Sequence, residues 1–346
     1  MKLAYWVVFL GIASCVNRSV VSVEETAEAS LSEIAEHVVA IPLETNERCR
    51  MGPVDAVKRA GSEFFMLSNR MLYRFDRTGR FLSRIASDRD GRCSAIRDFA
   101  VDPQRRQVVA IDTCGHALFF TYDGTLVRRK ALAEKPWQSL LKIAYHDGHF
   151  WATAEQCATS ASGGERKIEK WLYRLDASFD VVNGTPLYDV DLKRFHLSSH
   201  FDPELCVSPH GLYAYTASYE PEKLLADTLA LIDGNRLEKI LHASTDHPVP
   251  MLPFRIGQRF LMASNGKNGD ESRYFYCYDQ LEQRAFCLKN GFTDDFYQTG
   301  HLPDLQALDV YGSEFCYCRS GQAVSRLCPE RAATDNPVLF VVRLKA

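Results

Sequence analysis

Three cysteines near the end of the chain have spacing that could support metal chemistry. Cys316 and Cys318 are two residues apart, so they lie on one face of a predicted strand. A zinc site would need two further ligands, and neither a CxxC nor a histidine pair accompanies them. Cys328 lies close by in the sequence. We therefore favour a disulfide between Cys328 and either Cys316 or Cys318 over a metal site.

A histidine pair in the middle of the chain resembles a second metal motif. His196 and His200 are four residues apart, as metal ligands on a helix would be, but Leu197 occupies the position where a metalloprotease carries its glutamate. We predict a surface loop there. Nucleophile and phosphate-binding motifs are absent from the sequence: residues 160–164 form a small-residue loop without a GxSxG or P-loop pattern.

Acidic side chains offer a third kind of chemistry. Asp102, Asp112 and Asp309 could line a central channel and hold calcium, which prefers oxygen ligands. The competing interpretation is structural, because aspartates in turns commonly accept hydrogen bonds from their own backbone. The sequence leaves both interpretations open for these three residues.

The elements that must position these residues repeat along the chain. An aromatic or aliphatic residue runs into an aspartate five times, at Asp76, Asp123, Asp176, Asp233 and Asp279. The gaps of 47, 53, 57 and 46 residues are typical of a repeat protein. Each aspartate ends one apolar strand just before a second begins, which predicts a hairpin.

About four short strands fit into each repeat, which is the content of one propeller blade. We predict an all-β fold, a six-bladed β-propeller of four-stranded antiparallel blades over residues 37–346. The last blade has only three strands of its own, and residues 37–43 near the N-terminus can supply the fourth. Strands from both termini would then close the ring and remove its free edges.

The N-terminal sequence predicts where in the cell the protein is located. Lys2 precedes an apolar run over residues 3–12, and Cys15 follows, as in a bacterial lipoprotein signal. The run is too short to span a bilayer. We predict a signal peptide over residues 1–14, lipidation of Cys15 and a tether over residues 15–36. An ordinary signal peptide with a chance cysteine is the alternative.

Composition agrees with one large folded unit. The chain has 46% hydrophobic and 25% charged residues, enough for a sizeable core. Loss of Lys2 with the signal peptide leaves 40 of the 41 basic residues against 44 acidic ones, a net charge of −4. No basic stripe with interleaved aromatics occurs, so we predict no nucleic-acid partner. The lipid would hold the protein to a membrane, facing the periplasm or the cell surface.

Ten cysteines remain once Cys15 is set aside, an even number that could pair in an oxidising compartment. Cys277 and Cys287 lie symmetrically about a turn near Glu282. If they face each other across that hairpin, they are the first candidates for a disulfide. Buried free thiols are the alternative.

Several segments together resemble a known family. Residues 39–46, the Phe-Asp-x-x-Gly-x-Phe core within residues 73–85, residues 97–102 and the closing residues 335–339 are similar to the six-bladed β-propeller lipoproteins of Gram-negative bacteria. The resemblance implies an NHL-like propeller on a lipid anchor at Cys15. It implies no shared catalytic residues. The Gly-Pro-x-Glu-Tyr loop of that family is replaced here by residues 90–94, Asp-Gly-Arg-Cys-Ser.

Two functional classes fit these observations. The first is a noncatalytic binding or scaffolding lipoprotein for a glycan, peptide or protein partner, which needs no cofactor. The second is a hydrolase or lyase of the lactonase type with a divalent cation such as calcium in the central channel. We favour the first, because the sequence has no recognisable catalytic constellation.

Overall fold

The computed structural model describes residues 5–8, 20–23, 28–87, 91, 94–132, 137, 139–159, 166–191, 204–208, 211–220, 223–233, 236–244, 251–256, 259–265, 274–279, 281–303, 305–309, 313–332 and 334–346. By their contacts they divide into two compact units. One unit comprises residues 46–205 and 232–236, and the other comprises residues 1–45, 206–231 and 237–346.

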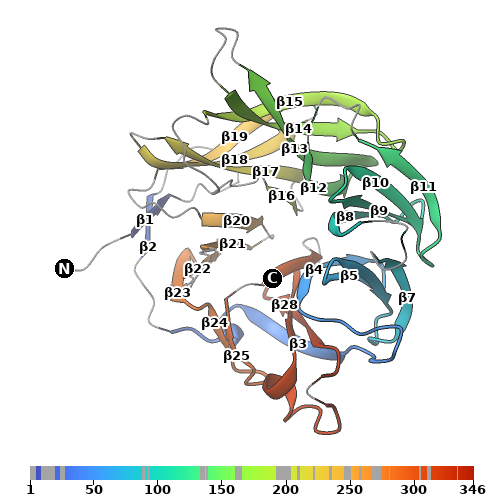
Figure 1. The fold of residues 1–346 in the computed structure, drawn as a ribbon. Helices are drawn as coiled ribbons and strands as arrows, with labels where there is room; N and C mark the ends of the chain where they lie inside the picture. Colours follow the sequence, from blue (N-terminus) through green and yellow to red (C-terminus); the bar gives the residue numbers. More distant parts are fainter. Residues whose placement is uncertain are drawn as a thin grey trace. The chain divides into compact units, whose positions relative to one another are not determined.

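The predicted hairpins form six four-stranded antiparallel sheets in the described part of the chain (Figure 1). Blade 1 contains β4 (Val54–Ala60), β5 (Glu63–Ser68), β6 (Met71–Phe75) and β7 (Phe81–Ala86). Blade 2 contains β8 (Ile96–Asp102), β9 (Gln107–Asp112), β10 (His116–Thr121) and β11 (Leu126–Ala131). Blade 3 contains β12 (Ser139–His146), β13 (His149–Thr159), β14 (Arg166–Leu175) and β15 (Val181–Asp191).

The remaining sheets follow the same order. Blade 4 contains β16 (Glu204–Ser208), β17 (Gly211–Glu220), β18 (Lys223–Asp233) and β19 (Arg236–Ser244). Blade 5 contains β20 (Met251–Ile256), β21 (Phe260–Asn265), β22 (Tyr274–Asp279) and β23 (Arg284–Lys289). Blade 6 contains β26 (Gln306–Asp309), β27 (Glu314–Arg319), β28 (Val338–Leu344) and β3 (Ala35–Pro42).

The burial of each strand explains its sequence pattern. The middle strands β5 and β9 are buried along nearly their whole length, and they read as continuous apolar runs. The outer strand β11 instead alternates between half-buried and exposed residues, as a sheet edge does. Packing between blades 1 and 2 centres on Phe65, Phe99 and Phe120, and packing between blades 2 and 3 on Phe119 and Phe150.

Blade 6 joins the two ends of the chain, as predicted. Its strand β3 pairs antiparallel with β28 over residues 35–42, so the N-terminal strand begins two residues earlier than expected. The buried Asn336 fastens this pairing: its Nδ2 donates to the Glu44 carbonyl at 2.6 Å, and its backbone N–H donates to Thr45 Oγ1 at 2.8 Å. Arg331 donates to the carbonyls of Leu43 and Asn336.

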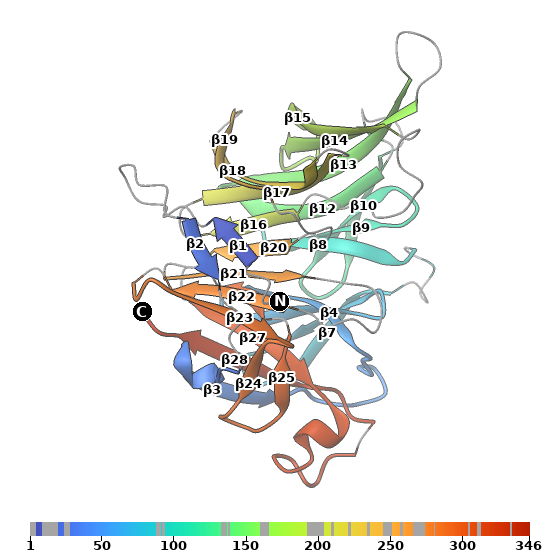
Figure 2. The same cartoon turned by 90° about the vertical axis from the view of Figure 1, so that its left-hand side faces the viewer.

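A small hairpin holds the chain just before β3. It consists of β24 (Phe292–Asp294) and β25 (Gly300–Leu302), and it lies beside the short 3-10 helix η1 (Leu31–Glu33) and β3 (Figure 2). Ser32 donates to the Asp295 carboxylate, and Thr293 N–H donates to the Ala29 carbonyl at 2.9 Å. A second 3-10 helix, η3 (Gly321–Val324), precedes β28.

The N-terminal segment contains two further strands. β1 (Tyr5–Val8) pairs antiparallel with β2 (Val20–Val23) within the predicted signal peptide and tether. The predicted lipidation residue Cys15 lies outside the described residues. No helix in the described part of the chain is long and apolar enough to cross a membrane.

Candidate functional site

The repeated aspartates cap the turns between the two outer strands of a blade. Asp76 and Asp176 each accept backbone N–H groups from the residues two and four positions later, at 2.8 to 3.0 Å. Asp123 accepts the N–H two positions later at 3.0 Å, and Asp279 accepts the N–H groups two and three positions later. The repeat is therefore a structural signature of the turn. The side chain of Asp233 lies outside the described part.

The carboxylates considered for calcium bind their own turns in the same way. Asp102 is fully buried and accepts the N–H groups of Gln104 and Arg105 at 3.0 and 3.1 Å. Asp112 accepts two backbone N–H groups of the next turn. Asp102 precedes β9 and Asp112 ends it, so about 16 Å of strand at roughly 3.3 Å per residue separates these turns. The side chain of Asp309 lies outside the described part.

Metal-binding groups do not gather elsewhere among the described side chains: no three His, Cys, Asp or Glu residues lie close enough to hold an ion. His196, His200 and residues 160–164 lie outside the described residues. The predictions made for them are unaffected by the structure.

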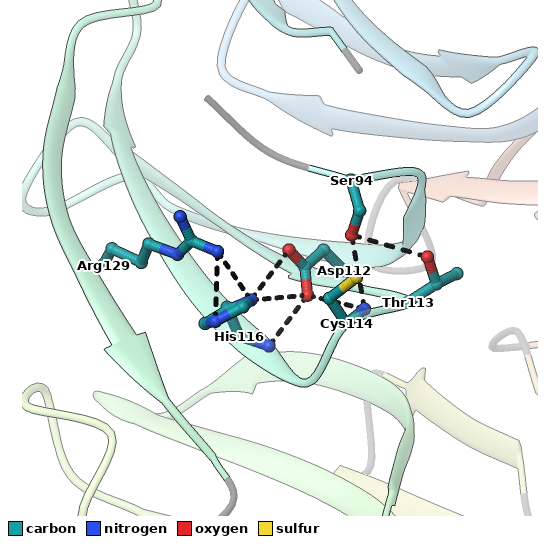
Figure 3. Close-up of polar contacts among 6 residues, drawn as sticks. All are labelled: Ser94, Asp112, Thr113, Cys114, His116 and Arg129. Atoms are coloured by element: carbon teal, nitrogen blue, oxygen red, sulfur yellow. Dashed lines mark hydrogen bonds and ion pairs between the residues drawn. The ribbon is translucent and has the colours of Figure 1, made fainter. Parts of the chain in front are cut away.

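A polar cluster surrounds the β9–β10 turn, and the sequence singled out none of its members except Asp112 (Figure 3). This turn cluster comprises Ser94, Asp112, Thr113, Cys114, His116 and Arg129. Asp112 Oδ1 accepts the N–H groups of Cys114 and His116 at 3.0 and 2.8 Å, and the turn between them needs Gly115, whose φ is +80°. The Asp-x-x-Gly spacing is the signal in the sequence that could have predicted this turn.

The imidazole of His116 lies between a carboxylate and a guanidinium group. Its Nδ1 is 3.1 Å from Asp112 Oδ2, and Arg129 Nη2 is 3.1 Å from each of its ring nitrogens. Burial would raise the pKa of Asp112, but hydrogen bonds from His116 and Ser94 outweigh it and hold the pKa below its ordinary value. Asp112 is thus a carboxylate at neutral pH, and both ring nitrogens of His116 are engaged.

The exposed thiol of the turn cluster is not activated by the histidine. Cys114 is a free cysteine at the surface, and among the described residues no hydrogen bond joins its Sγ to the imidazole. Ser94 Oγ instead accepts the Cys114 backbone N–H at 3.2 Å, which ties the linker after blade 1 to the turn. The cluster therefore lacks the nucleophile–base contact that acyl transfer requires.

An ion pair joins the innermost strands of blades 1 to 3. Lys58 on β4 lies 3.3 Å from Asp98 on β8. The same carboxylate accepts the Ile143 N–H of β12 at 2.8 Å and the Phe99 N–H at 2.8 Å. Lys58 also donates to the carbonyls of Phe99 and Ile143. Because every one of these donors has an acceptor within the protein, the pair is built to hold the blades together.

The predicted register of the Cys277 hairpin is wrong by one residue. β22 and β23 pair Cys277 with Phe286 and Tyr276 with Cys287. Adjacent residues of a strand point to opposite faces, so the two cysteines do not face each other and a disulfide between them would need a different register. Cys277 is a buried free thiol, and burial raises its pKa.

The pairing predicted for Cys328 is not formed in this structure. Cys328 is buried and Cys318 is half-buried, and both are free thiols. Burial raises the pKa of Cys318 to about 12. Cys316 is fully buried on β27, two residues before Cys318 on the same strand.

The six four-stranded antiparallel sheets define an all-β protein, a six-bladed β-propeller. Residues 13–201 match the family model DUF5128, described as a 6-bladed beta-propeller. Because the match covers more than half of the 346 residues, the chain belongs to that family. No curated protein matches the chain in sequence.

Two solved structures are similar to this chain. One is a protein of Bacteroides fragilis NCTC 9343 whose assigned name is that of an exported protein, with a TM-score of 0.65 and 15% identity over 94% of this chain and 99% of that one. At this identity the likeness shows the fold alone. The other is the Cps50 (Swd1) β-propeller domain of Myceliophteria thermophila, with a TM-score of 0.47 and 9% identity over 88% of this chain and all of that one.

Proposed function

We propose that this protein is an envelope lipoprotein whose NHL-like propeller binds a glycan, peptide or protein partner without transforming it. The supporting observation is how the polar side chains are used. The repeated aspartates cap turns, Asp112 and Arg129 engage His116, and the Lys58–Asp98 pair links three strands. A catalytic group needs an atom left free for substrate, whereas these groups are used to hold loops in place for recognition.

Anchoring through Cys15 belongs to the same proposal. The lipoprotein pattern of residues 1–15 supports it, as does the name, that of an exported protein, given to the Bacteroides fragilis protein that shares the fold. The predicted tether spans residues 15–36, and within it the structure describes residues 20–23 and 28–36.

A thermal-shift experiment tests the binding role. Soluble protein of residues 16–346 is heated with calcium and other divalent cations, with oligosaccharides and with peptides, because a ligand that binds only the folded state raises the melting temperature. We expect an organic ligand to raise the melting temperature, and we expect this increase to persist when a chelator is present. A shift with a cation that is abolished by chelator, followed by turnover of a lactone, would contradict the proposal and favour the lactonase type.

A further inference from the structure

Blade 3 is extended beyond its innermost strand. β13, β14 and β15 have 11, 10 and 11 residues, against 6 in each of β9, β10 and β11. The β12–β13 pairing stops at Ser139 and Glu155, while β13 continues to pair with β14 as far as Thr159. The surplus residues form a three-stranded extension of blade 3, seen as long ribbons in Figure 2.

Three polar and aromatic side chains share one face where this extension begins. Gln156 lies directly opposite Glu169, and Trp171 follows two positions along the same strand. Glu169 Oε2 accepts Trp171 Nε1 at 3.0 Å and Gln156 Nε2 at 2.7 Å. We name these three residues, Gln156, Glu169 and Trp171, the blade-3 platform. All three are half-buried, so each retains some surface exposed to solvent.

Rigid packing supports the indole of the platform. Trp171 stacks on the ring of Tyr173 with centroids 5.9 Å apart and an interplanar angle of 15°. Tyr173 is only 3% exposed and meets Trp137 edge-on at 4.9 Å. It also lies against Gly184 of β15, where an added Cβ would be 2.6 Å from its Cε1. The indole is therefore fixed before any ligand arrives, which reduces the entropy lost on binding.

Two acceptors of the platform have no hydrogen-bond partner among the described residues. Glu169 Oε2 accepts hydrogen bonds from both Gln156 Nε2 and Trp171 Nε1. Neither Glu169 Oε1 nor Gln156 Oε1 accepts a hydrogen bond from any residue that the structure describes. A fixed aromatic face beside two free, planar oxygen acceptors matches a ligand that has an apolar face and several hydroxyl donors at its rim.

We propose that the blade-3 platform binds a neutral glycan, with one sugar ring stacked on Trp171 and its hydroxyl groups donating to Glu169 Oε1 and Gln156 Oε1. This inference rests on the proposed binding function and names its ligand class. A sugar pyranose ring has C–H groups on one face and hydroxyls around its edge, which is the complement of this arrangement.

The charge of the platform selects against acidic glycans. Glu169 forms no ion pair with any described cation, and the neighbouring Lys170 points to the opposite face, where it contacts Glu155 at 2.9 Å. A uronate or sulfate would place a second negative charge beside Glu169. Two negative charges side by side repel each other, so the platform favours neutral sugars.

A titration tests the inference. The soluble protein, residues 16–346, is titrated with neutral oligosaccharides of glucose, mannose, galactose and xylose. Binding is followed by calorimetry and by tryptophan fluorescence. An oligogalacturonate of equal length is the acidic comparison. We expect at least one neutral oligosaccharide to bind, at least tenfold more tightly than the acidic one, and its binding to change the tryptophan emission.

Substitutions locate the site. Trp171→Ala, and separately Glu169→Ala with Gln156→Ala, are expected to weaken binding at least tenfold, while Trp171→Phe retains part of it. The matched control Val182→Ala changes an exposed residue of neighbouring β15 and is expected to bind like wild type. The double variant leaves the ring stack intact, so it tests the site even if Trp171→Ala does not fold.

Each other outcome overturns the inference. If a neutral glycan binds the platform variants as tightly as wild type, the site is wrong although the binding function stands. If only peptides or acidic glycans bind, the ligand class is wrong. If no ligand of any class binds wild type, both the inference and the proposed function fail.

Discussion

Tyr122 and Tyr317 carry buried hydroxyl groups in opposite circumstances. The ring of Tyr122 lies beneath the guanidinium groups of Arg74 and Arg106, 5.2 and 4.7 Å from its centroid, but no residue that the structure describes forms a hydrogen bond with its hydroxyl. Burial, with the nearby charge of Glu63, raises its pKa to about 12. Tyr317 OH instead donates to the buried Asp294 at 2.9 Å.

Replacing each tyrosine by phenylalanine should therefore have opposite effects. Tyr122→Phe removes a polar group that pays a desolvation penalty, so we expect the free energy of unfolding to rise by about 1 kcal/mol. Tyr317→Phe removes a donor from a carboxylate and should cost about 1.5–3 kcal/mol. Urea titration at pH 7 measures both. Equal destabilisation by the two changes would show that the Tyr122 hydroxyl is paired after all.

Asp279 links the turn of blade 5 to Arg259. Burial alone would raise the pKa of Asp279, but the hydrogen bond from Arg259 and the N–H groups of Glu282 and Leu281 outweigh it and lower the pKa below 3.8. A carboxyl group whose folded pKa is depressed stabilises the folded state above its unfolded pKa. That contribution is lost as the pH falls through the folded value.

We expect Asp279→Asn to lower stability at neutral pH and to flatten its loss in acid. The free energy of unfolding of wild type should fall between about pH 5 and pH 2, as its protected carboxylates take up protons. The variant should lose less over that window. The exposed Glu47→Gln serves as control. A variant with the wild-type pH profile would mean that Asp279 contributes nothing to acid sensitivity.

At the scale of elements, blade 6 depends on a strand from the far end of the chain. Four residues of β28, Val338, Leu339, Phe340 and Val342, are fully buried. Loss of β3 would expose one edge of β28 and the apolar side chains beside it. Exposed apolar edges invite pairing with other chains.

Two deletions separate this strand from the predicted tether. Starting from soluble residues 16–346, removal of residues 16–27 should leave the melting temperature within a few degrees. Removal of residues 16–43 also removes β3 and should abolish cooperative unfolding or cause aggregation. Scanning calorimetry and gel filtration measure both. Equal behaviour of the two proteins would mean that β3 adds no stability.

The element scale also shows where sequence patterns reach their limit. The hairpins around Asp76, Asp123 and Asp176 follow from an apolar run, a turn aspartate and a second run, and the structure confirms them. The one-residue error at Cys277 arose because symmetry about a turn was taken to fix the register. Turn geometry sets the register, and a shift of one residue reverses every side chain.

At the scale of the whole molecule, the proposed lipid anchor would hold the propeller at the membrane, where it would bind its ligands. Cys15→Ala in the full-length protein should prevent lipid attachment, so the protein should move from the detergent-soluble membrane fraction to the aqueous fraction. Labelling with an alkyne fatty acid and fractionation of the host cells measure this. A variant that stays in the membrane fraction and is still labelled would contradict lipidation at Cys15.

The sequence by itself determined the all-β class, the six blades and the use of an N-terminal strand to complete blade 6, because strand alternation and turn aspartates are local patterns that recur along the chain. Only the tertiary structure decided which side chains meet. Asp102 proved to end β8 and Asp112 to end β9, at opposite ends of that hairpin, while Gln156, Glu169 and Trp171 came together from two strands. Such contacts depend on register and strand length, which are set by packing across sheets.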